Sequence, residues 1–235
     1  EYILFLDDDV YLPPDGVEYL FNAMKQYDGD VISPDVFNNA GRSTKQEIPL
    51  ILSGRISVRY KDNTWGYKVM RNGGYSYNKH PRPIMKSQTN AGPCFLCKKN
   101  DFEKIRFQEE LWLDDMPYAL GEDQTMFYKM FLSGLNVLTS YDSGIKHLDA
   151  GTTIKNVEKE KVLAFCDCRF KLIFWKRFLF DNVTRANKVV NLICFVYTMI
   201  INLLISLIKG NTTIFKQKYS GYRSGFQFLK TNSAK

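Results

Sequence analysis

The chain has 235 residues, of which 45% are hydrophobic and 24% are charged, and its formal net charge is +7. These proportions are ordinary for globular proteins, so they exclude a chain that is disordered along most of its length. Residues 1–154 contain 17 Lys and Arg against 21 Asp and Glu, whereas residues 155–235 contain 15 against 4, so the C-terminal third is expected to bind nucleic acid or an anionic membrane surface.

The first predicted element is a buried strand over residues 2–6, which ends in three carboxylates, Asp7, Asp8 and Asp9. Side chains alternate along a strand, so Asp7 and Asp9 are expected on one side and Asp8 on the other. Two carboxylates on one side form a hard-oxygen site for Mg²⁺ or Mn²⁺. The alternative is a solvated turn, because a Pro-Pro-Asp-Gly turn signal follows.

The strand begins directly at the start of the sequence. A strand needs neighbours on both sides to be buried, so residues that precede Glu1 are expected to supply adjacent strands of the same sheet. The sequence is therefore interpreted as a fragment.

A helix is predicted over residues 15–27 from apolar residues at 3 and 4 spacing, and a short strand over residues 31–34. Residues 38–88 have weak periodicity, which predicts long loops or a hairpin over one face that binds substrate. The aromatic residues of this segment are either stacking surfaces for a sugar ring or simple packing residues. They are Trp65, Tyr67, Tyr75 and Tyr77.

A turn that contains Gly92 opens a predicted strand over residues 94–98, followed by a short helix. The pair Glu122 and Asp123 then precedes apolar residues at helical spacing, so both carboxylates are expected in the first turn of an amphipathic helix. Helix N-termini favour negative charge, so capping is the alternative role for this pair. His147 ends a later predicted strand, either as a third ligand to the same metal or as an ordinary polar residue.

The five cysteines, at positions 94, 97, 166, 168 and 194, do not form the dense, even pattern of a secreted disulfide scaffold. A reducing compartment fits them better. Cys94 and Cys97 form a CxxC, but no second pair or nearby histidine completes a zinc set, so they are interpreted as packing residues.

Residues 157–188 combine aromatic and basic positions, which is typical of helices at membrane surfaces. Residues 189–208 then form a run of twenty without a charge, long enough to span a bilayer. Its polar residues, Asn191, Thr198, Asn202 and Ser206, form a narrow stripe, which predicts a helix that packs one side on protein or lies at the interface. A core helix is the alternative. The tail, residues 210–235, is predicted to be a loosely ordered basic extension.

The order of these parts resembles a family 2 glycosyltransferase with the GT-A fold. The resemblance covers about residues 1–150 and rests on the strand that ends in Asp7-Asp8-Asp9, the Asn90-Ala91-Gly92-Pro93 strand opening, and Gly121-Glu122-Asp123 before a helix. It implies an α/β fold with a mixed sheet flanked by helices, incomplete at its N-terminus because the nucleotide-binding unit is missing. The implied catalytic domain is residues 1–154, and residues 155–235 form a helical, membrane-associated region.

The resemblance also implies roles for individual residues. Asp9 matches the last carboxylate of the family's DxD motif, which binds Mn²⁺ or Mg²⁺, and Asp7 matches the first. Asp7, Asp8 and Gly92 are assigned to the nucleotide-sugar site, and His147 to the metal or the diphosphate. Asp123 matches the catalytic base, with Glu122 before it as in the usual pair. Such enzymes invert the anomeric configuration.

The implied function is metal-dependent transfer of a sugar from a nucleotide diphosphate to a glycan or lipid-linked hydroxyl, by a membrane-associated protein whose catalytic part is cytoplasmic. No nucleic-acid partner is expected, because a nucleic-acid groove would not need the apolar run. Two alternatives remain open. A haloacid dehalogenase-type phosphatase also begins with a strand and DxD, but here Val10-Tyr11-Leu12 follows in place of small residues. A non-catalytic membrane scaffold would need none of the acids.

Overall fold

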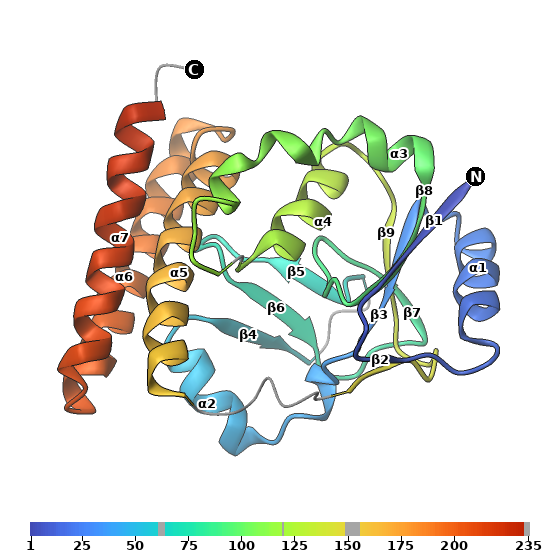
Figure 1. Cartoon of the computed structure of the whole chain (residues 1–235), viewed down its shortest axis with the longest axis horizontal. Coiled ribbons are helices and arrows are strands. Elements are labelled where there is room, and N and C mark those ends of the chain that lie inside the picture. The colour runs from blue at the N-terminus through green and yellow to red at the C-terminus, as the bar shows by residue number, and fades with distance from the viewer. Residues whose placement is uncertain (61–63, 119, 149–155, 233–235) are drawn as a thin grey trace.

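The computed structural model describes residues 1–60, 64–118, 120–148 and 156–232. The protein is a mixed α/β structure with sheets flanked by helices, as predicted (Figure 1). Its main sheet has five strands, of which β3 and β9 are parallel and the other neighbours antiparallel. In spatial order these are β1 (Tyr2–Leu6), β8 (Cys94–Lys98), β3 (Val31–Pro34), β9 (Val137–Ser140) and β7 (Ile84–Lys86).

Helices cover both faces of this sheet because its central strands are apolar on both sides. Ile32, Leu96 and Leu138 pack under α1 (Gly16–Gln26), which contributes Leu20 and Met24 to the core. Their neighbours Val31, Phe95 and Val137 point to the opposite face. There they pack on α4 (Glu122–Leu132), with the short helix α3 (Lys99–Lys104) at the end of the strand β8. The alternation of side chains thus fixes the two helical layers.

The first strand is not buried as predicted. β1 lies at the edge of the sheet, where it pairs with β8 alone among the described strands. Phe5 stacks on Phe95 with ring centroids 4.3 Å apart, but Tyr2, Leu4 and Leu6 are exposed. An apolar run does not by itself distinguish a central strand from one at an edge, because position in the sheet depends on which strands pair with it.

Residues 38–88 contain a hairpin, which is one of the two predictions for this segment, but they also form further regular elements. They contain α2 (Thr44–Leu52) and a second sheet, with β4 (Ile56–Arg59) parallel and β5 (Tyr67–Val69) antiparallel to β6 (Tyr75–Asn78). Polar contacts hold this unit: the buried Glu47 carboxylate of α2 accepts a hydrogen bond from the Tyr77 hydroxyl at 2.8 Å and pairs with Lys79. A small apolar cluster of Ile56, Tyr67 and Tyr77 completes the core of this unit, and its strands are only three or four residues long, so little apolar periodicity marks them in the sequence.

Three long helices form the C-terminal region and lie side by side at one end of the molecule (Figure 1). They are α5 (Val157–Phe174), continued by a π-helical segment (Trp175–Phe180), α6 (Arg185–Ile208) and α7 (Thr212–Asn232). The prediction of a loosely ordered tail is therefore wrong for residues 212–232. The reason is close packing: a Cβ added at Gly221 of α7 would lie 2.3 Å from the Phe165 carbonyl oxygen of α5.

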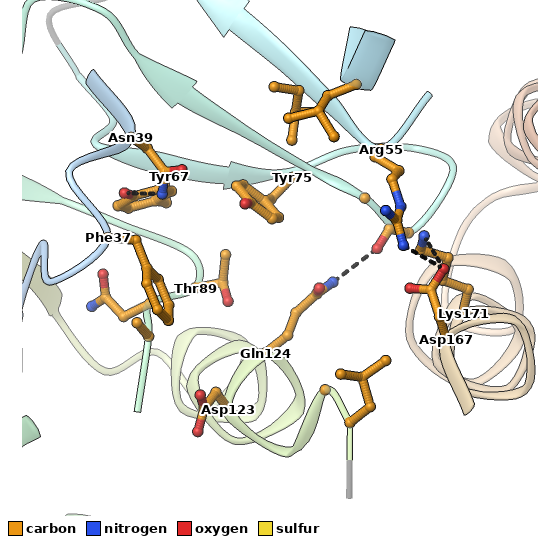
Figure 2. Close-up of a pocket in the computed structure, with 18 of the residues that line it drawn as sticks. Phe37, Asn39, Arg55, Tyr67, Tyr75, Thr89, Asp123, Gln124, Asp167 and Lys171 are labelled. Carbon is orange, nitrogen blue, oxygen red and sulfur yellow. Dashed lines mark hydrogen bonds and ion pairs between the residues drawn. The ribbon is translucent and has the colours of Figure 1, made fainter. Parts of the chain in front are cut away.

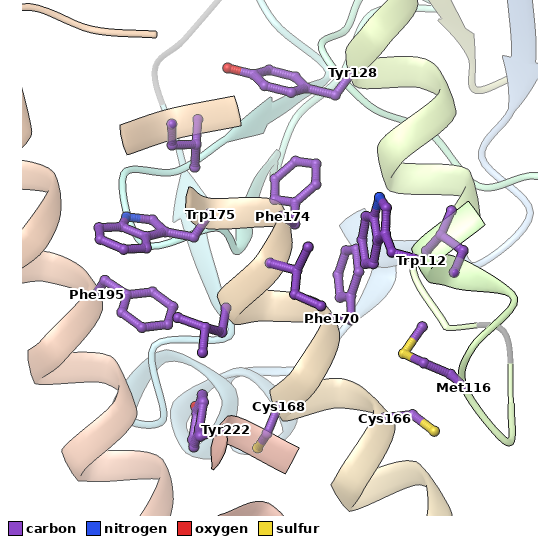
Figure 3. Packing of buried hydrophobic residues seen from close by; sticks show 14 of the residues in the cluster. Trp112, Met116, Tyr128, Cys166, Cys168, Phe170, Phe174, Trp175, Phe195 and Tyr222 are labelled. Atoms are coloured by element: carbon purple, nitrogen blue, oxygen red, sulfur yellow. The ribbon is translucent and has the colours of Figure 1, made fainter. Parts of the chain in front are cut away.

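A large buried cluster joins these helices to the α/β part (Figure 3). Phe170 of α5 packs against Trp112, which lies in a short 3-10 turn, and Phe174 packs against Tyr128 of α4. Trp175 stacks on Phe195 of α6 with ring centroids 4.3 Å apart. The Trp112 and Phe170 rings are stacked with centroids 6.0 Å apart. The predicted boundary between residues 154 and 155 lies outside the described residues.

Candidate active site

The structure brings Asp7, Asp9 and His147 together. One potential ligand atom from each lies within 4.8 Å of the others, and Nε2 of His147 is 3.2 Å from Oδ1 of Asp9. Asp8 is exposed beside them and is not part of the group. Burial and the charge of Asp9 raise the pKa of Asp7. Two carboxylates and an imidazole so arranged match the donor set that Mn²⁺ accepts.

A short two-stranded ribbon positions the histidine. β10 (Lys146–His147) pairs with β2 (Val10–Tyr11), which places His147 opposite Val10. The Leu148 amide donates a further hydrogen bond to the Asp9 carbonyl oxygen. The strand that follows the acidic triplet therefore holds His147 beside Asp9, although the two residues are far apart in the sequence.

A loop connects the acidic triplet to Asp123. The Gly92 amide donates a hydrogen bond to Oδ2 of Asp123 at 2.9 Å, and one residue on, the Pro93 carbonyl accepts from the Asp7 amide at 2.8 Å. A Cβ at residue 92 would lie 1.8 Å from Oδ1 of Asp123, so only glycine allows this approach. Asp7 and Asp123 are thus held on either side of a two-residue segment.

Both carboxylates at the start of α4 bind protons more tightly than exposed ones. Burial, with a smaller contribution from the charge of Asp7, raises the pKa of Asp123 to about 6 although the Gly92 amide opposes this. Burial and the charges of Asp123 and Asp7 raise the pKa of Glu122 to about 7. Oε2 of Glu122 has no hydrogen-bond partner in the described part of the chain. Such values are typical of groups that exchange protons near neutral pH.

Asp123 faces a cavity of about 430 Å³ between the two sheets and α5 (Figure 2). Figure 2 shows Asp123 towards one end and Arg55, Asp167 and Lys171 at the other. A second cavity, of about 530 Å³, is lined by His147, and Asp35 lines both. Of the metal group, His147 alone lines one of these two cavities, so His147 and Asp123 border neighbouring spaces, whereas Asp7 and Asp9 line neither.

Aromatic and amide groups line the side of the cavity that lies away from Arg55 (Figure 2). Asn39 is buried, donates to the Tyr67 hydroxyl at 2.7 Å, and has no partner for its Oδ1 among the described residues. Tyr67 in turn donates to Asp35 at 2.5 Å. Phe37 and Tyr75 supply rings beside them (Figure 2). An unpaired carbonyl oxygen beside aromatic rings suits a ligand that carries hydroxyl groups.

Of the four aromatic residues proposed from the sequence, Tyr67 and Tyr75 line the cavity. Tyr77 is buried against Glu47, and the Trp65 ring packs against Phe131 with centroids 5.6 Å apart. Several lining residues lie in no motif, and only contacts across the fold bring them to the site. These are Phe37, Asn39, Arg55, Asp167 and Lys171. Gln124 had a local signal, because it directly follows Asp123, and it donates to the Gly73 carbonyl at 2.9 Å.

Comparison of the chain with protein-family models finds no match, and comparison with curated protein sequences finds none either.

Proposed function

We propose that this protein is a metal-dependent, inverting glycosyltransferase that transfers a sugar from a nucleotide diphosphate to a hydroxyl group of a glycan or lipid-linked acceptor. One observation supports it most strongly: the acidic group at the end of β1 and the acid at the start of α4 meet at the same short loop, Gly92–Pro93. We further propose that the five-stranded sheet is a GT-A sheet, because β1, β8 and α4 carry the family's motifs in the family's order.

The residues present fit a divalent cation. Asp7, Asp9 and His147 would hold it, and the positive charge of a cation would offset the repulsion between Asp7 and Asp9 that contributes to the raised pKa of Asp7. Asp8 and Gly92 complete the proposed nucleotide-sugar site, Asp8 from the exposed side. When bound, Mn²⁺ or Mg²⁺ stabilises negative charge on the departing diphosphate.

Asp123 is the proposed catalytic base. It lines the cavity and is fixed by the Gly92 amide, so its free oxygen can accept the proton of an acceptor hydroxyl that attacks the sugar. Glu122 precedes Asp123 at the start of α4, and its raised pKa leaves it protonated for much of the time at neutral pH, which limits repulsion beside Asp123. A single displacement with one base gives inversion.

Metal dependence tests this proposal. We expect the complete gene product to release nucleotide diphosphate from a nucleotide sugar in the presence of Mn²⁺ and to stop when the metal is chelated. In this chain, Asp9→Asn should weaken Mn²⁺ binding by at least about tenfold, measured by calorimetry, because a coordinating carboxylate is lost. Asp114→Asn, an exposed acid of the 3-10 turn, is the matched control. Phosphate release without an acceptor would instead indicate a phosphatase, and equal Mn²⁺ affinity in all three proteins would contradict the metal site.

Membrane association is part of the proposal, and α6 supports it. Among the described helices, α6 is long and apolar enough to cross a membrane. The polar residues Asn191, Thr198, Asn202 and Ser206 are buried against the protein together with Phe195, whereas most of the other apolar residues of α6 are exposed or half-buried. A core helix would bury its apolar side, so this arrangement favours lipid as the neighbour.

We propose that α6 lies in the interface plane, because hydrogen bonds join it to the rest of the protein along its length. Arg71 donates to Asn191 at 2.9 Å, Asn72 donates to Thr198 at 2.8 Å, and Lys218 of α7 donates to Asn202 at 2.7 Å. If α6 crossed the bilayer, the donors Arg71, Asn72 and Lys218 would have to enter the hydrocarbon region with it, which is unfavourable for polar groups. The catalytic part is assigned to the cytoplasm, where the five free cysteines remain reduced.

Vesicle binding tests the membrane assignment. Ile193 and Tyr197 of α6 are 64% and 61% exposed. Their replacement by Glu should lower binding to anionic phospholipid vesicles by about tenfold for each side chain removed. Leu111→Glu makes the same change at a side chain that is 65% exposed far from α6 in sequence, and it should bind like the wild type. Sedimentation with vesicles measures this. Equal binding by all the proteins would contradict the interfacial face.

A further inference from the structure

The end of the cavity that α5 lines is cationic. Nη2 of Arg55 lies 3.1 Å and Nζ of Lys171 lies 2.9 Å from the same Asp167 oxygen (Figure 2). We propose that Arg55 and Lys171 form a phosphate-binding subsite, and that the acceptor of the transfer carries a phosphate group on the part that lies away from its reacting hydroxyl. This substrate class rests on the proposed function, whereas the phosphate subsite itself can be tested without it.

The local charges do not balance. One carboxylate, Asp167, faces two cations, and its pKa is lowered to about 2 by these partners although burial opposes this, so it remains ionised. Lys218 of α7 is a third cation close enough for the charges of Arg55 and Lys171 to act on it, and burial is the main cause of its lowered pKa. An excess of positive charge in a partly enclosed space favours an anion.

The geometry selects phosphate among anions. Arg55 uses one nitrogen on Asp167, and its side chain is 48% exposed, so the rest of its planar guanidinium can bind two oxygens of one ligand. Lys171 adds a point charge from the neighbouring turn of α5. The opposite end of the cavity carries Asp123 and Asp35, which suit hydroxyl donors. A ligand with hydroxyl groups at one end and phosphate at the other matches this polarity.

The position of this end favours a lipid-linked phosphate as the source. Arg55 follows Gly54, where an added Cβ would lie 2.8 Å from the Thr198 hydroxyl of α6. Asn72 joins the same two segments, since it donates to the Gly54 carbonyl and to Thr198, both at 2.8 Å. The cationic end thus adjoins the helix whose outer face is apolar. A soluble sugar phosphate offers the same chemistry, so the experiment separates the two sources.

Inorganic phosphate is the first probe, measured by calorimetry on this chain with a chelator present so that no metal contributes. Phosphate is expected to bind, Arg55→Gln and Lys171→Gln should each weaken it by about tenfold or more, and Asp167→Asn should tighten it because both cations lose their internal partner. Lys104→Gln removes an exposed cation and should have no effect. A variant that only disturbed folding could not increase affinity, so the opposite signs distinguish binding from instability.

The second probe is a polyprenyl phosphate in phosphatidylcholine vesicles, compared with a soluble sugar 1-phosphate. We expect Arg55→Gln to lower binding to the phosphate-containing vesicles by about tenfold relative to vesicles of phosphatidylcholine alone. Tighter binding of the soluble sugar phosphate, with no vesicle effect, would overturn the lipid source. Absence of phosphate binding, or equal binding by Arg55→Gln, Lys171→Gln and the wild type, would overturn the subsite. Asp123→Asn should bind phosphate normally, so loss of transfer alone leaves this inference intact.

Discussion

Asp123→Asn is expected to lower the rate of sugar transfer by the complete gene product between about a hundredfold and ten thousandfold, the usual contribution of a general base. Asn has nearly the same shape and can still accept the hydrogen bond from the Gly92 amide at 2.9 Å, so the loop stays in place. Only the ability to accept a proton is removed. Initial rates of nucleotide diphosphate release with saturating Mn²⁺ measure the effect.

Two controls make the Asp123 result specific. Asp15→Asn makes the same change at the N-cap of α1, where the side chain forms no capping hydrogen bond, and it should retain full activity. Mn²⁺ affinity should not change in Asp123→Asn, because Asp123 is not in the metal group. Wild-type rates in the Asp123 variant would contradict its role as the base.

The pH dependence of the rate follows from the same carboxylate. A base must be deprotonated, and the pKa of Asp123 is about 6 because of burial, so kcat/KM should rise as pH increases and level off above about 6. The stability of the fold changes in the opposite sense. The folded chain binds this proton more tightly than the unfolded chain, so the contribution of Asp123 to stability falls as pH rises from the ordinary carboxyl pKa through about 6. Asp123→Asn should therefore be at least as stable as the wild type at neutral pH.

Gly221→Ala is expected to lower the free energy of unfolding by about 2 kcal/mol, within the usual range for overpacking. Helix propensity alone predicts the opposite sign, since Ala in a helix interior is about 1 kcal/mol better than Gly. Packing decides, because the new Cβ would lie 2.3 Å from the Phe165 carbonyl oxygen and 3.1 Å from Cβ of Cys168. Backbone atoms of α5 cannot move aside as a flexible side chain would, so α7 must shift.

Thermal unfolding measures this effect, and the shift in Tm should be about 5 °C downward for a chain of this size. Ser220→Ala is the matched control: it introduces the same residue one position earlier, on the exposed side of α7, and should leave Tm nearly unchanged. If Gly221→Ala stabilised the protein, α7 would not pack closely on α5, and its position in the fold would be wrong.

The acidic elements of the site were predictable because each lies in one short segment. Asp7 and Asp9 are separated by one residue, and Glu122 and Asp123 begin a helix whose apolar face is periodic, so local rules are sufficient. The cavity was not predictable. Arg55 and Asp167 are 112 residues apart, and Asn39 of a 3-10 turn meets Tyr67 of β5, where no periodic pattern marks either partner.

The sequence by itself determined the mixed α/β class, the acidic ends of β1 and the α4 start, and the apolar helix α6, because strand alternation and helical periodicity are properties of neighbouring residues. The tertiary structure decided what those elements face. It placed β1 at an edge, folded residues 212–232 into a helix, and turned the polar side of α6 inward. The physical reason is that packing depends on contacts between distant segments, such as Gly221 against the α5 backbone, and a single residue type gives no local sign of its partner.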